Sequence, residues 1–446
     1  MNQSKMLNSK VAIVGCGVAG ISASLELTKN GVPHTIFEAK NFIGGRFYSF
    51  FDKELGFEID NGQHFFSLAY KNFFELLEQL DTKSHVEKVS KIEIPFFSKE
   101  FGLIPFEEKI FKGKLGLLFG ILNFRLLPFK QRINLLRLLF TIILSKNFPK
   151  NINTQKYLLQ QNQEHIIIDK FWNPIAVSIF NNSIDCIPTE IFFNIFKIAL
   201  LGKSNQIGFT YSKVPQSLLF VNFQDSIKPQ GQLLLATAVK KIKKNSAMFE
   251  LETNSNQKFY FEKVILCVQP NVLKKILPEE WLINEYFRFL DFVQFNPILS
   301  IFITTNEEIT PKAFGFLDDS PFHWIFNKTQ MFGLPSPPYH YSFTTSNAKD
   351  LVSLSQTRII ELLEQEIFKF FRKKINIIAC KVIKDKFATV ALDSYFFKYR
   401  PEQVSPVDGL FIAGDWTQTN LPVTLESAAL SGKLAVSKML KQNGDI

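Results

Sequence analysis

Residues 11–38 read VAIVGCGVAGISASLELTKNGVPHTIFE, and this stretch decides the fold of the chain. The apolar run at 11–14 predicts a buried strand, residues 21–29 have helical apolar spacing, and residues 34–38 predict a second strand. The turn after the first strand carries three glycines in the spacing G-x-G-x-x-G: Gly15, Gly17 and Gly20. Strand, glycine-rich turn, helix and strand in this order predict a Rossmann-type unit that binds a dinucleotide.

Each part of this unit has a physical role. Gly15 makes the tight turn, Gly17 lets backbone N–H groups approach a pyrophosphate, and Gly20 lets the helix pack closely on the strand. Glu38 ends the second strand, where its carboxylate can bind both ribose hydroxyls of an adenosine. That carboxylate disfavours a 2′-phosphate, so an NADP-type adenosine is not expected. Taken alone, the unit is compatible with either FAD or NAD.

Two further motifs follow Glu38 and favour FAD. Gly44, Gly45 and Arg46 suit a loop that folds back over the pyrophosphate, with the Arg46 guanidinium neutralising it. Residues 60–64, DNGQH, then form a dense polar run between apolar flanks.

A second cofactor-binding element is expected near the C-terminus. Residues 410–413 predict a strand that runs into Gly414 and Asp415, and a helix is predicted from about Thr424 to residue 440. Asp415 fits a contact to the pyrophosphate or the ribityl chain of a flavin, and the helix N-terminus can face the anionic N1/O2 edge of the flavin ring. A nicotinamide enzyme does not need such a distant second element, so we expect FAD.

These motifs together resemble those of the flavin amine oxidases and phytoene-type desaturases. The finer resemblance is to the squalene-associated FAD-dependent desaturases, the hydroxysqualene dehydroxylases of squalene and hopanoid biosynthesis. It is carried by DNGQHFFSLAY at 60–70 and by AGDWTQTNLPVTLESAALSG at 413–432. The sequence departs from the family pattern at Cys16, where Gly or Ala is usual, and at Ser427, where Gly is common.

The resemblance implies an α/β fold in which a Rossmann-type FAD-binding domain is interleaved with an α+β substrate domain. The FAD-binding domain is expected from residues 1–70, 225–270 and 405–446, and the substrate domain from residues 71–224 and 271–404. The resemblance also places Gly62 and Gln63 near the flavin, and the backbone of Val239 near the adenine. An ordinary strand residue is the alternative for Val239.

The implied reaction is a reductive dehydroxylation. An allylic C30 alcohol, hydroxysqualene, loses its hydroxyl as water and takes a hydride from reduced FAD to give squalene. The hydroxyl needs a proton donor, and Asp60 and His64 are the candidates, because His64 would titrate near neutral pH. A purely structural role in holding the loop is the alternative for both residues. Glu426, on the helix after the 413–415 AGD run, is expected to order the helix start near the flavin.

Two other functions stay open at this stage. One is an amine oxidase or carotenoid-type desaturase that runs the flavin in the oxidative direction on another apolar substrate. The other is a scaffold that binds isoprenoids for a partner synthase without turnover. No second nucleotide motif is evident, so NAD(P)H is not implied and the external electron donor is unidentified.

The net charge of +10 comes from 51 Lys and Arg against 41 Asp and Glu, and all of the excess lies in one segment. Residues 109–163 contain ten cations and no acid, and within this segment residues 115–129 and 133–144 form nearly continuous apolar sequence. Because 128–132 interrupts that sequence, each piece is too short to span a bilayer. We expect residues 109–156 to make peripheral contact with an anionic membrane. A pair of core helices with a solvated basic edge is the alternative, and no nucleic acid is expected.

The overall composition fits a globular protein, with 46% hydrophobic and 21% charged residues. The 49 phenylalanines fit either biased codon usage or an aromatic-lined cavity for an apolar substrate. Four cysteines lack the spacing of a metal site or of a disulfide framework, so no metal is expected. They favour a reducing compartment. We expect a cytoplasmic protein without a signal peptide, peripheral at the cytoplasmic membrane face.

Overall fold

The computed structural model describes residues 9–88, 93–107, 113–203 and 206–442. Its first unit matches the sequence prediction: β1 (Val11–Val14), α1 (Val18–Lys29) and β2 (His34–Phe37). Every residue of β1 and β2 is buried, as expected of parallel strands covered on both faces.

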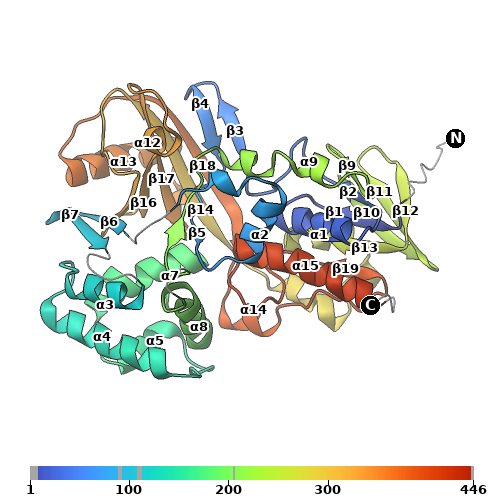
Figure 1. Cartoon of the computed structure of the whole chain (residues 1–446), viewed down its shortest axis with the longest axis horizontal. Coiled ribbons are helices and arrows are strands. Elements are labelled where there is room, and N and C mark those ends of the chain that lie inside the picture. The colour runs from blue at the N-terminus through green and yellow to red at the C-terminus, as the bar shows by residue number, and fades with distance from the viewer. Residues whose placement is uncertain (1–8, 89–92, 108–112, 204–205, 443–446) are drawn as a thin grey trace.

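A five-stranded parallel sheet surrounds this unit, in the order β19-β13-β1-β2-β9. The three added strands are β9 (Gly231–Leu234), β13 (Lys263–Leu266) and β19 (Leu410–Ile412). The sheet therefore joins strands from three segments that lie far apart in the chain. The C-terminal helix α15 (Leu425–Lys441) packs on α1 (Figure 1). A small antiparallel sheet of β10 (Val239–Asn245), β11 (Met248–Thr253) and β12 (Lys258–Phe261) lies at the same end of the molecule.

A second, larger sheet has seven strands in the order β18-β14-β17-β16-β15-β6-β7, and all neighbours except β15 and β6 are antiparallel. Its strands are β6 (Glu93–Ser98), β7 (Gly102–Glu107), β14 (Phe295–Thr305), β15 (Phe314–Leu317), β16 (Trp324–Asn327), β17 (Tyr339–Ser346) and β18 (Ile377–Val390). Helix α13 (Gln356–Phe371) follows β17 in the chain.

Short elements connect the two sheets. They are the hairpin β3 (Ser49–Asp52) and β4 (Phe57–Asp60), the pair β5 (Phe66–Ser67) and β8 (Phe209–Thr210), and helices α2 (Asn72–Gln79), α9 (Phe223–Ser226), α10 (Pro270–Ile276), α11 (Glu279–Leu282) and α14 (Ser394–Lys398). Helix α12 (Lys328–Phe332) instead joins β16 to β17 within the larger sheet. The architecture is therefore α/β, with a Rossmann-type sheet interleaved with an α+β part. This confirms the predicted fold class.

A helical layer completes the α+β part at the end of the molecule opposite β10–β12 (Figure 1). It contains α3 (Lys114–Leu122), α4 (Phe129–Leu144), α5 (Thr154–Gln160), α6 (His165–Ile167), α7 (Asn173–Phe180) and α8 (Thr189–Leu200). Among the described residues, no helix has the length and apolarity needed to cross a bilayer.

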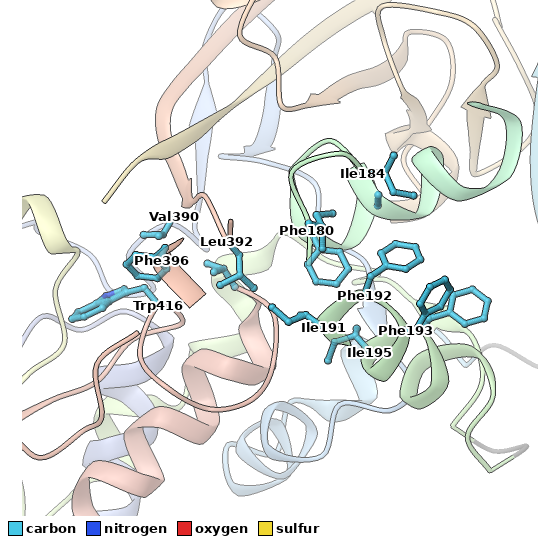
Figure 2. Close-up of a cluster of buried hydrophobic side chains, with 14 of the residues drawn as sticks. Phe180, Ile184, Ile191, Phe192, Phe193, Ile195, Val390, Leu392, Phe396 and Trp416 are labelled. Atoms are coloured by element: carbon cyan, nitrogen blue, oxygen red, sulfur yellow. The ribbon is translucent and has the colours of Figure 1, made fainter. Parts of the chain in front are cut away.

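An apolar core runs from this helical layer toward the smaller sheet. Figure 2 shows Phe180 on α7 and Phe192 on α8 in one cluster with Leu392 and Trp416. Trp172 is also fully buried there, and its ring meets that of Phe196 with centroids 5.2 Å apart. Many of the phenylalanines therefore serve as core.

Candidate functional site

The three glycines of the first turn differ in what surrounds them. Gly15 has φ +98°, and a Cβ there would lie 2.6 Å from the carbonyl oxygen of Cys267. A Cβ on Gly20 would lie 2.0 Å from the carbonyl oxygen of Gly15. A Cβ on Gly17 would meet nothing closer than the Gly45 Cα at 3.8 Å. The protein's own packing therefore requires Gly15 and Gly20, whereas Gly17 leaves open space where a ligand's phosphates would approach.

The second glycine pair folds back onto this turn, as predicted. The N–H of Gly44 donates to the carbonyl oxygen of Cys16 over 2.8 Å, and Gly44 forms an isolated bridge with Gly17. Gly45 has φ +66°, and a Cβ there would lie 3.0 Å from the Gly17 Cα. The two glycine-rich segments are thus in direct contact.

The carboxylate that is expected to bind the adenosine is fixed by backbone hydrogen bonds. Glu38 is buried, and its two oxygens accept from the backbone N–H groups of Cys16 at 2.7 Å and Lys40 at 2.9 Å. Each carboxylate oxygen keeps a second lone pair for a ribose hydroxyl. Thr237 donates its N–H to the Glu38 carbonyl, which brings the start of β10, at Val239, to this side of the site.

The C-terminal element brings Asp415 to Arg46 in the second glycine-rich segment. Arg46 donates to Asp415 Oδ2 over 2.7 Å and to the Ala388 carbonyl over 2.6 Å. The guanidinium that was expected to neutralise a pyrophosphate is therefore paired with Asp415. The other oxygen, Asp415 Oδ1, is buried without a hydrogen-bond partner. Such an orphaned acceptor fits a hydroxyl donor of a bound ribityl chain.

Arg400 and Ser431 stabilise the loop that carries Asp415 through hydrogen bonds to its backbone. Arg400 is buried and donates to the backbone carbonyls of Asp415, Trp416 and Leu421, and burial lowers its pKa to about 10. Gly414 donates its N–H to Ser431 Oγ, and a Cβ on Gly414 would lie 2.4 Å from Trp416 Nε1. The sequence analysis did not identify Arg400 as a site residue.

Helix α15 begins as predicted. Thr424 is its N-cap and accepts from the Ser427 N–H. The Glu426 carboxylate accepts from the backbone N–H groups of Lys71, Asn72 and Phe73, all within 3.0 Å, and so caps the start of α2. Glu426 therefore orders the start of α2, whereas the start of its own helix is capped by Thr424.

The two departures from the family pattern are accommodated locally. Ser427 Oγ donates to the Asp415 carbonyl over 2.9 Å, so this hydroxyl supports the C-terminal loop. Cys16 is buried beside the glycine turn, and burial raises the pKa of its thiol well above the usual value.

Asp60, in the polar run at 60–64, forms a buried ion pair with a lysine that the sequence did not indicate. Lys328 Nζ lies 2.6 Å from Asp60 Oδ2, both side chains are fully buried, and Lys328 also donates to Gln63 Oε1. Asp60 Oδ1 accepts from Ser49 Oγ at 2.7 Å and from the Gln216 N–H at 3.0 Å. Gln216 Nε2 in turn donates to the Gly62 carbonyl over 2.8 Å.

One signal in the sequence could have pointed to this lysine. Lys328 is the only Lys or Arg between Lys312 and Lys349, in a stretch rich in aromatic residues. An isolated cation in apolar surroundings is more often paired than solvated. Its partner Asp60 lies 268 residues away, however, and no local pattern indicates that pairing.

The pKa of His64 differs from the near-neutral value expected from the sequence. Desolvation lowers the pKa of His64 to about 4, and the cations Arg46 and Lys328 lower it further while Asp60 opposes them. At pH 7 the imidazole is therefore neutral, and the imidazolium invoked from the sequence is a minor species. Its ring packs against Phe47, with centroids 5.3 Å apart.

Comparison with known protein families agrees with the flavin-binding site described above. The family model for flavin-containing amine oxidoreductases matches residues 18–440. The chain belongs to the flavin-containing amine oxidoreductase family. Among curated proteins, it is 22% identical to 15-cis-phytoene desaturase of Synechococcus elongatus, over 98% of this chain and 97% of that protein. It is 21% identical to zeta-carotene desaturase of Arabidopsis thaliana, over 96% of this chain and 84% of that protein.

Solved structures with the same fold cover nearly the whole chain. An oxidoreductase from Methanosarcina mazei superposes with a TM-score of 0.75 at 16% identity, over 97% of this chain and 99% of that one. Cyclohexylamine oxidase from Brevibacterium oxydans superposes with a TM-score of 0.71 at 12% identity, over 98% of this chain and 100% of that one. At these identities the likeness shows the shared fold.

The protein is therefore a flavin-dependent oxidoreductase, and its cofactor is FAD. The residues present fit that cofactor at three points: the open space at Gly17, the free lone pairs of Glu38 and the orphaned Asp415 Oδ1.

Proposed function

We propose that this flavin-containing amine oxidoreductase acts on an apolar isoprenoid and catalyses the reductive dehydroxylation of an allylic C30 alcohol, hydroxysqualene, to squalene. The observation that carries the proposal is the buried Asp60–Lys328 pair, which supplies a proton donor and a compensating carboxylate next to the polar run at 60–64. Glu38, Gly17 and Asp415 would hold FAD, which supplies the hydride when it is bound in its reduced form.

An aromatic cluster adjoins this run and suits an apolar substrate. Phe65 follows His64 directly, and its ring centroid lies 4.5 Å from that of Phe209 and 5.1 Å from those of Phe314 and Trp324. These four side chains are only partly buried. Their ring faces can stabilise a cation, which the departure of an allylic hydroxyl as water would generate.

The Asp60–Lys328 pair offers a source for the proton that the leaving hydroxyl requires. Lys328 is a cationic acid held in place by Asp60 and Gln63, whereas His64 is neutral at pH 7. Transfer of a proton from Lys328 to the hydroxyl releases water and leaves the negative charge of Asp60 uncompensated. That charge then stabilises the allylic cation until the hydride arrives. The balance is alcohol, proton and hydride in, and squalene and water out.

One anaerobic reaction tests the proposal. Purified protein, FAD, dithionite and hydroxysqualene are incubated without oxygen, and the extract is analysed by gas chromatography–mass spectrometry. We expect squalene only when protein and reductant are both present. No squalene from a preparation with confirmed flavin absorbance would refute the dehydroxylation and leave the flavoprotein assignment standing.

A paired substitution tests the role of Lys328. Removing one member alone would leave a buried unpaired charge, so the informative variant is Asp60→Asn with Lys328→Met. We expect normal FAD content and loss of dehydroxylation, because the proton donor is gone. The matched control is Lys381→Met, which breaks the Lys381–Asp52 ion pair between β18 and β3 at a more exposed position. Full activity of the double variant would remove Lys328 from the mechanism.

The oxidative alternative has one specific observation in its favour, the similarity to phytoene and zeta-carotene desaturases. We propose it as the second candidate, with a carotenoid precursor as substrate. Under this alternative, oxidised FAD protein with a quinone acceptor would desaturate phytoene, and dithionite would abolish the reaction. The reductive proposal predicts the opposite dependence on the reductant.

A further inference from the structure

Helix α4 has two apolar sides, and only one of them is buried. Its inner side, made by Leu135, Leu138, Leu139 and Ile142, packs into the core. Its outer side carries Phe129, Phe140 and Leu144, which are 67%, 64% and 66% exposed. At 100° per residue these three positions fall within a 60° arc. A helix that is apolar on both sides is normally covered on both sides.

A neighbouring helix extends this exposed apolar surface. Leu115 on α3 is 55% exposed, and α3 packs on α4. We call Leu115, Phe129, Phe140 and Leu144 the outer apolar face. Large exposed apolar side chains that gather on two adjacent helices mark an interaction surface rather than scattered surface residues.

Cations surround the outer apolar face. Lys114, Arg125, Lys130, Arg137 and Lys146 are all exposed and all come from the acid-free segment 109–163. Arg132 does not belong with them, because it donates to the carbonyls of Leu122 and Leu127 and so joins α3 to α4. Lys150 lies 3.7 Å from Glu190 and is also set apart.

We propose that the outer apolar face and its surrounding cations dock on an anionic lipid bilayer, with α4 lying in the plane of the interface. Phenylalanines and leucines on one helix side enter the boundary between headgroups and acyl chains, and flanking Lys and Arg attract anionic headgroups. The unbroken positive sign of the segment is complementary to such a surface. The surface lies at the end of the molecule opposite β10–β12, away from the Rossmann-type sheet (Figure 1).

Vesicle pelleting of the FAD-loaded protein tests the docking. The lipids are phosphatidylcholine alone and phosphatidylcholine with phosphatidylglycerol. We expect strong binding only to the vesicles with phosphatidylglycerol, decreasing as salt rises. At about 1 kcal/mol for each cation, the variant Arg125→Gln, Lys130→Gln, Arg137→Gln should bind these vesicles about 100-fold more weakly. The variant Phe129→Ser, Phe140→Ser, Leu144→Ser should also lose binding.

A control set distinguishes docking from general charge. Lys240, Lys241 and Lys243 are exposed on β10 at the opposite end of the molecule. Their triple change to Gln removes the same charge and should leave pelleting nearly unchanged. Flavin absorbance and melting temperature of every variant show that it is folded.

Two results would overturn the proposal. The first is equal weakening in the β10 control and in the α4 charge variant. The second is a wild-type dimer in analytical ultracentrifugation that the Phe129, Phe140, Leu144 variant abolishes, because a second copy would then cover the face. Neither result depends on turnover, so this proposal can fail while the proposed reaction stands.

Discussion

Replacing Gly17 with Ala tests whether this glycine is required for FAD binding and not for the stability of the folded protein. A Cβ at Gly17 has its nearest neighbour at 3.8 Å, and φ is −77°, a value that alanine adopts readily. The folded apoprotein should therefore change in stability by about 1 kcal/mol or less, since a slightly poorer helix cap offsets the reduced entropy of the unfolded chain. The new methyl group instead occupies the space through which a pyrophosphate would approach the backbone.

The expected loss of FAD affinity follows from the hydrogen bonds between backbone N–H groups and the pyrophosphate. Losing one backbone N–H bond to a phosphate costs about 1.5–3 kcal/mol, so FAD affinity should fall roughly 10- to 150-fold. Gly20→Ala is the contrasting variant. Its Cβ would lie 2.0 Å from the carbonyl oxygen of Gly15, so it should destabilise the apoprotein as well.

The assay is fluorescence titration of deflavinated protein with FAD, combined with thermal melting of the apoprotein. We expect weakened FAD binding with an unchanged apoprotein melting temperature for Gly17→Ala, and losses in both quantities for Gly20→Ala. Wild-type FAD affinity in Gly17→Ala would refute the placement of the pyrophosphate at this turn.

Further predictions concern the buried polar groups. Because the pKa of His64 is about 4 in the folded state, against about 6.5 unfolded, stability present above pH 6.5 should fall by about 3 kcal/mol as the pH drops toward 4. Denaturant unfolding of His64→Gln against pH should show a flatter profile. Lys328→Met leaves Asp60 buried without its partner and should cost about 3–5 kcal/mol in the same assay, against about 1 kcal/mol or less for Lys381→Met. Glu426→Ala removes the acceptor of three backbone N–H groups and should cost about 2 kcal/mol, with increased hydrogen exchange at the start of α2.

Local sequence patterns were sufficient for the elements around the cofactor. The strand, turn and helix at 11–29 follow from apolar period and glycine spacing, and the start of α15 follows from Thr424 as an N-cap. The fold-back at Gly44 and Gly45 was also predictable, because two adjacent glycines permit the positive φ angles that the close approach requires.

Contacts between distant segments were not predictable from such patterns. Lys328 meets Asp60 across 268 residues, and Arg46 meets Asp415 across 369. The pKa of His64 depends on burial by the surrounding protein and on two cations, Arg46 and Lys328, so the reference value for histidine was misleading. Residues 109–156 were predicted to contact a membrane surface. Only the structure shows which side chains of α4 stay exposed, and that Arg132 hydrogen-bonds to a backbone carbonyl of the protein itself.

The most direct measurement of the central claim is a single turnover. Enzyme with its bound FAD is photoreduced without oxygen and mixed with hydroxysqualene, and the recovery of oxidised flavin absorbance is followed beside the squalene formed. We expect flavin reoxidation and squalene formation to proceed at the same rate and in equal amounts. Flavin that stays reduced in the presence of the alcohol, or reoxidation without squalene, would rule out the proposed reaction.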